Sequence, residues 1–112
     1  MFMPAVVFAF QATVPSPSQR GLNLFNDCKA LIRRQNGSYA PKDVLGAEEC
    51  SGYFAATAEL ESGKSFCLKD HYSIETLARI YVVFIEKNPK YLDVLEAEGA
   101  VAALKDAYPC GQ

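Results

Sequence analysis

The residues best suited to chemistry in this 112-residue chain are four cysteines, Cys28, Cys50, Cys67 and Cys110, and a single histidine, His71. No two of the cysteines form a C-x-x-C pair, so the chain lacks the ligand spacing of a zinc ribbon or a thioredoxin-type redox couple. An even number of widely spaced cysteines is typical of an exported protein with two disulfides. The alternative is four reduced cysteines buried in the core of a cytosolic protein.

His71 follows Cys67 by four residues, a spacing that suggests a cysteine–histidine nucleophile or a metal site. A disulfide-bonded Cys67 has no thiolate to offer, and the sequence supplies no further metal ligands nearby. The chain also lacks the common nucleophile-elbow, zinc-protease and phosphate-binding motifs. We therefore expect a solvated loop histidine in a protein that is not an enzyme and has no metal, cofactor or catalytic residue. The carboxylates of Glu48 and Glu49 are expected on the wet side of a helix.

Charge and length narrow the function classes further. The mass of 12.3 kDa suits one compact domain, which we expect over residues 21–112. The formal net charge is -2 and the longest basic run is the pair Arg33–Arg34. Nucleic acid is therefore an unsuitable partner, since its binding needs a basic patch.

Residues 1–20 are expected to be a truncated signal peptide and linker. The stretch begins with an apolar run of about the length of a signal-peptide h-region, and a segment rich in proline and serine follows. The run is too short to span a bilayer, so the mature protein is expected in the periplasm without a membrane segment. The alternative is an apolar N-terminal tail.

Apolar periodicity and helix-capping residues predict four helices. They cover residues 21–34 and 44–62, a segment that starts after Ser73 and breaks at Asn88–Pro89, and residues 91–107. The third segment is rich in β-branched residues, as a buried strand would be, but its cap and its length favour a helix. The predicted fold class is all-α: a small disulfide-stapled bundle of four helices, or five if one is split.

Two apolar stripes give the expected inward faces of the first and last helices. Leu22, Phe25, Cys28, Leu31 and Ile32 form the first stripe, and Ala97, Val101, Leu104 and Tyr108 form the last. The third helix is apolar nearly all the way round. Either it is wrapped by the other three helices, or one of its faces packs against a second copy or a partner.

Four cysteines allow three pairings, and the packing of the predicted helices favours one of them. Cys28 and Cys50 lie on the inward stripes of consecutive helices that would pack as an antiparallel hairpin. Cys67 precedes the third helix and Cys110 follows the last. We therefore predict the disulfides Cys28–Cys50 and Cys67–Cys110.

Several fragments in this order resemble the Tai-type family of type VI secretion amidase immunity proteins. They are Leu24–Cys28, Cys50–Ala56, Phe66–Leu68, Glu86–Pro89 and Ala103–Cys110, and together they cover about residues 21–110. The resemblance implies a periplasmic, all-helical and usually homodimeric protein. Its partner would be a secreted cysteine amidase effector that cleaves peptidoglycan, which it would block by steric occlusion.

An occluding protein needs a protruding segment that fills the cleft of the enzyme. The exposed turns Ser65–Tyr72 and Asn88–Asp93 are the candidates, with Tyr72 and Tyr91 as preferred anchors because tyrosine offers a large contact area with a polar tip. Either tyrosine could instead simply pack its own loop onto the bundle. The full set of candidate partner-binding residues is Lys69, His71, Tyr72, Asn88, Lys90 and Tyr91. The alternative function is a periplasmic helical binding or scaffold module without an amidase partner.

Overall fold

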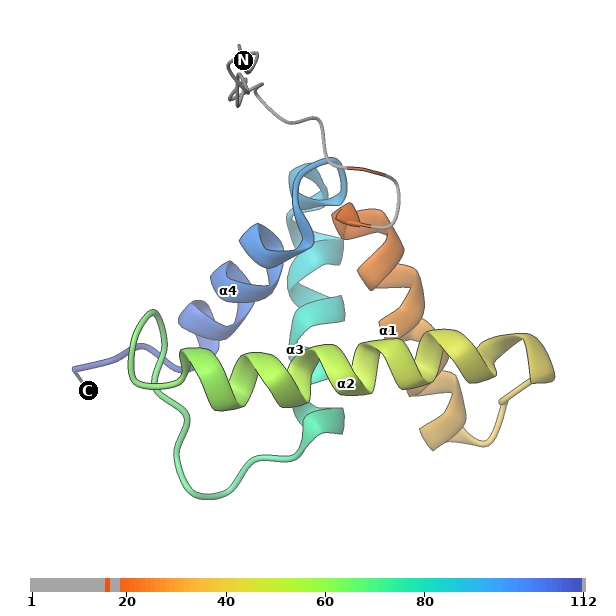
Figure 1. Ribbon diagram of the computed structural model, residues 1–112, viewed down its shortest axis with the longest axis horizontal. Helices are drawn as coiled ribbons and strands as arrows, with labels where there is room; N and C mark the ends of the chain where they lie inside the picture. Colours follow the sequence, from red (N-terminus) through yellow and green to blue (C-terminus); the bar gives the residue numbers. More distant parts are fainter. Residues whose placement is uncertain (1–15, 17–18, 112) are drawn as a thin grey trace, which may run out of the picture.

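The structure, a computed structural model, describes Ser16 and residues 19–111, so most of the predicted leader lies outside the described residues. The fold is all-α, as predicted (Figure 1). The elements are α1 (Gly21–Asn36), the 3-10 turn η2 (Pro41–Asp43), α2 (Val44–Glu61), α3 (Ile74–Lys87), the 3-10 turn η3 (Pro89–Leu92) and α4 (Glu96–Ala107). No helix in this part of the chain is both long enough and apolar enough to cross a membrane.

The third helix, α3, is the centre of the bundle. It packs against α1, α2 and α4, and it buries Leu77, Tyr81 and Ile85 completely or nearly so. The hydroxyl of the buried Tyr81 donates a hydrogen bond of 3.2 Å to the carbonyl oxygen of Gly21, so its polar end is satisfied inside the core. Three helices therefore surround α3. One face of α3 stays open, since Val83 is 49% exposed, so contact of this face with a second copy or a partner stays a prediction.

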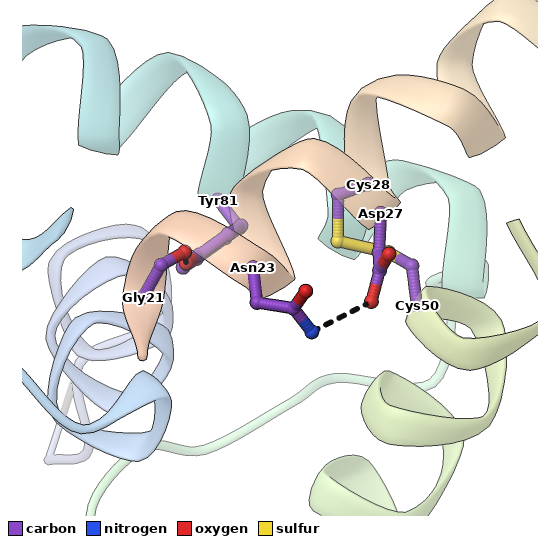
Figure 2. The surroundings of a disulfide bond; sticks show 6 residues. All are labelled: Gly21, Asn23, Asp27, Cys28, Cys50 and Tyr81. Atoms are coloured by element: carbon purple, nitrogen blue, oxygen red, sulfur yellow. Dashed lines mark hydrogen bonds between the residues drawn. A yellow bond between two sulfur atoms is a disulfide. The ribbon is translucent and has the colours of Figure 1, made fainter. Parts of the chain in front are cut away.

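Both predicted disulfides are present, and they account for all four cysteines. Cys28 and Cys50 are fully buried and join α1 to α2 at the point where the two helices meet α3 (Figure 2). Cys67 and Cys110 join the segment before α3 to the end of the chain.

An ion pair closes the corner between α1 and α2. Arg33 donates two hydrogen bonds to the carboxylate of the buried Asp43, at 2.7 and 3.1 Å, and the backbone N–H of Ala40 donates a third at 3.1 Å. The guanidinium of Arg33, followed by the N–H of Ala40, lowers the pKa of Asp43 to about 2. A bidentate contact of this kind fixes the direction in which α2 leaves the turn.

The last helix differs from the prediction: α4 begins at Glu96 and not at residue 91. Residues 89–92 form η3, and the following segment pairs with the start of α1. There Gly21 donates a backbone hydrogen bond of 2.8 Å to Val94, and Arg20 and Leu95 form an antiparallel bridge. This pairing requires extended backbone, so the helix starts only after it.

Two inward faces also differ from the predicted stripes. In α1, Leu24 is buried and Leu22 is 49% exposed, because residues two apart on a helix point in nearly opposite directions. In α4, Ala97 is exposed and the buried residues are Gly99, Ala100, Ala103 and Leu104. The small residues Gly99, Ala100 and Ala103 let α4 approach α3 so closely that a side chain at Gly99 would meet Ile85 at 3.0 Å.

Two glycine substitutions should have opposite effects on stability. A Cβ at Gly21 would collide with the carbonyl oxygen of Tyr91, whereas a Cβ at Gly52, within α2, would meet nothing within 4 Å. Chemical denaturation should show that Gly21→Ala lowers the free energy of unfolding by about 2 kcal/mol or more. Gly52→Ala should raise it by up to about 1 kcal/mol, since alanine favours helix. Equal effects of the two substitutions would contradict the close packing of η3 on α1.

Candidate functional site

The connector, residues 62–73, joins α2 to α3 and is the longest non-helical stretch among the described residues from 19 to 111. In Figure 1 it leaves the end of α2 near the C-terminus and passes below the bundle to the start of α3. Its first half is anchored to the bundle by Phe66, which is fully buried. Its second half, residues 69–73, is exposed.

The anchored half is held by backbone contacts as well as by the disulfide. The N–H of Cys67 donates a hydrogen bond of 2.9 Å to the carbonyl of Tyr108, just before the disulfide partner Cys110. The N–H of Leu68 donates one of 3.0 Å to the hydroxyl of Ser62. The disulfide and two hydrogen bonds therefore fix the chain immediately before the exposed half begins.

Three of the predicted partner-binding residues lie together in the exposed half of the connector. Lys69, His71 and Tyr72 are all exposed, with Tyr72 at 41%. Their segment is held at its start by the Cys67–Cys110 disulfide and at its end by Ser73, the N-cap of α3. Anchoring both ends of a loop lowers the conformational entropy that its tyrosine loses when a partner buries it. This geometry suits a contact residue, and partner binding by these three residues remains a prediction.

The other three predicted residues lie at the far end of α3, about 20 Å away along a helix of this length. Asn88 donates its side-chain amide to the carbonyl of Phe84 at 2.9 Å. Tyr91 is half-buried, with its ring 5.5 Å from that of Phe84, and the ammonium of Lys90 lies 5.3 Å from the Tyr91 ring. The six candidates therefore form two separate groups, and Tyr91 packs its turn onto the bundle.

The described residues offer little for catalysis. Cys67 is disulfide-bonded, so it presents no thiolate beside His71. Within Ser16 and residues 19–111, no group of three or more histidine, cysteine or acidic side chains is arranged to hold a metal ion.

An acidic cluster between α1, α2 and α4 was missed by the sequence analysis. Burial, followed by the hydrogen bond and charge of Glu49 and then the charge of Glu96, raises the pKa of Asp27 to about 7. Burial and the charge of Glu49 also raise the pKa of Glu96. Figure 2 shows Asp27 beside the buried disulfide, where it accepts a hydrogen bond of 3.5 Å from Asn23. Glu49 is exposed as expected, but no local signal indicates that a residue as distant as Glu96 approaches it.

The raised pKa of Asp27 predicts a pH dependence of stability. Between its ordinary pKa of 3.8 and about 7, the folded protein holds a proton on Asp27 that the unfolded chain releases. The contribution of this residue to stability is therefore full below that range and is lost as the pH rises to 7 and above. We measure the free energy of unfolding by denaturation between pH 4 and 8. As the pH rises, this free energy should fall less in Asp27→Asn than in the parent. The control Glu59→Gln, which changes an exposed carboxylate, should behave as the parent does. An identical pH profile for Asp27→Asn and the parent would contradict this prediction.

Comparison with family models matches residues 20–110 to the Rap1a immunity proteins. Comparisons with curated proteins and with solved structures gave no match. The matched region contains α1, α2, α3 and α4, both disulfides and the whole connector. The family match agrees with the resemblance of the sequence to immunity proteins, but it does not specify the Tai type. The chain therefore belongs to the Rap1a immunity proteins, an immunity-protein family of type VI secretion systems.

Proposed function

We propose that the protein is a periplasmic immunity protein that binds a type VI secreted peptidoglycan amidase and sterically occludes its catalytic cleft. Membership of the family implies that the protein binds a secreted effector and acts as an inhibitor rather than as an enzyme. The amidase is inferred from the sequence resemblance to Tai-type proteins. The periplasm is inferred from the two disulfides, which indicate an oxidising compartment, and from the location of peptidoglycan.

The observation that carries the proposal is the braced connector. Its exposed residues 69–73 follow directly on a segment held by the Cys67–Cys110 disulfide, and they present Tyr72 between charged and polar neighbours. A pre-ordered protruding segment binds with a smaller entropy cost than a flexible one. The turn at Asn88–Asp93 is a weaker candidate, because Tyr91 is already packed against Phe84.

The resemblance also implies a homodimer, which we include in the proposal. A symmetric dimer would present two connectors and could bind two effector molecules. Sedimentation equilibrium of the purified protein measures this directly.

A rescue experiment tests the immunity function. A candidate amidase encoded beside the gene is directed to the periplasm of a test bacterium, with and without the exported protein. We expect lysis in its absence and normal growth in its presence. Continued lysis, together with no binding of the purified amidase, would contradict the proposal and favour a binding or scaffold module without an amidase partner.

Two tyrosine substitutions test the role of the connector. Tyr72 and Tyr39 are similarly exposed, at 41% and 39%, but Tyr39 lies in the turn between α1 and α2. Tyr72→Ala should weaken binding of the cognate amidase by about 2 kcal/mol, roughly 30-fold, as expected for an aromatic interface anchor. Tyr39→Ala should keep the affinity for the amidase within about twofold of that of the parent protein, since surface substitutions outside an interface have small effects. Calorimetric titration of both variants gives the comparison, and equal affinities would exclude Tyr72 as an anchor.

A further inference from the structure

A groove of ≈ 500 Å³ lies between α3 and α4, and none of its lining residues belongs to the connector. Its apolar lining comes from Ile80, Val83 and Phe84 of α3 and from Ala103 of α4. Ala103 is buried, whereas Val83 is 49% exposed. The groove therefore leaves apolar side chains of the central helix open to contact by another molecule.

The end of the groove next to η3 is already ordered. The ring of Phe84 rests on that of Tyr91, with 5.5 Å between the centroids. The side chain of Asn88 lines the groove and donates a hydrogen bond to the backbone of Phe84. A partner would therefore meet a preformed wall and would not have to order it.

Charge is distributed unevenly around the groove. Arg79 and Lys87, on the α3 side, are eight residues apart, which places them roughly 12 Å apart along the helix and about 80° apart around its axis. Arg79 also donates a hydrogen bond of 3.1 Å to the side-chain oxygen of Asn36 in α1. The α4 side contributes the single acidic residue Asp106. Although the chain as a whole carries a net charge of -2, the rim of this groove has two cations and one anion.

These cations disfavour a second copy of the chain as the occupant. Two copies packed groove to groove would bring four cations and two anions to one interface, because each rim carries Arg79, Lys87 and Asp106. Like charges brought together at an interface are unfavourable, so the groove suits a different, acidic partner.

We propose that the α3–α4 groove binds an acidic amphipathic helix of a protein partner. Apolar side chains of that helix would enter between Ile80, Val83 and Phe84, and carboxylates about two turns apart would pair with Arg79 and Lys87. This is the helix-in-groove mode of recognition. The proposal adds a second contact surface to the connector, and it does not depend on the partner being an amidase.

Two synthetic helical peptides test it by amide chemical-shift mapping of the isotope-labelled protein. Both carry two leucines on one face; one has glutamates two turns apart and the other has lysines at the same positions. The glutamate peptide should shift the amides of Ile80, Val83, Phe84 and Ala103 in a saturable way, and the lysine peptide should not. Val83→Glu should weaken binding of the glutamate peptide by at least about tenfold, since it places a negative charge in the groove beside the glutamates of the peptide.

Leu60→Glu is the matched control, because Leu60 is 66% exposed on α2 and lies outside this groove. If Val83→Glu perturbs the fold, Lys87→Glu tests the charge requirement at an exposed rim position. Equal binding of the two peptides, shifts that map elsewhere, or no saturable shift would each overturn the proposal. A self-association that Val83→Glu abolishes and Leu60→Glu preserves would also overturn it, since the occupant would then be a second copy.

Discussion

The buried disulfide between Cys28 and Cys50 is the constraint on which the rest of the bundle depends. It closes a loop with a sequence separation of 22, which in the chain-entropy model stabilises the fold by about 3 kcal/mol. It also fixes α1 and α2 at their crossing, so the two helices form one surface against which α3 packs. Phe54 of α2 meets Tyr81 of α3 at 5.4 Å between the ring centroids, and the Tyr81 hydroxyl reaches the first residue of α1. The ion pair of Arg33 with Asp43 then fixes the other end of the same hairpin.

With α3 held in the centre, both of its ends become anchoring points for loops. The connector before it is tied to the C-terminus through Cys67 and Cys110, and η3 after it packs on the start of α1 through Gly21. The two loops differ in what they expose. The connector directs Tyr72 to solvent, whereas η3 uses Tyr91 as internal packing. This difference supports the connector as the contact surface and assigns η3 a role in supporting the wall of the neighbouring groove.

Much of this fold could be predicted from local patterns. The number of helices, the Ser73 cap and both disulfide pairs follow from apolar periodicity and from the place of each cysteine relative to a helix. The start of α4 could not be predicted, because it is delayed by the pairing of Val94 and Leu95 with Arg20 and Gly21, which are distant in sequence. The buried face of α4 could not be predicted for another reason. Most of its buried residues are small, and only the position of α3 shows that they allow the two helices to pack closely. Only part of the candidate site could be predicted. The sequence indicates which turns are exposed, but it does not show that the two candidate turns lie at opposite ends of α3.

The central claim is that the braced connector is the surface at which an effector is bound. Amide hydrogen exchange of the protein alone and in complex with an amidase that it neutralises in the rescue experiment measures this most directly. We expect exchange to slow at residues 69–73 on complex formation, while exchange in the turn between α1 and α2 at residues 37–40 is unchanged. Slowed exchange confined to other segments, with no change at residues 69–73, would contradict it.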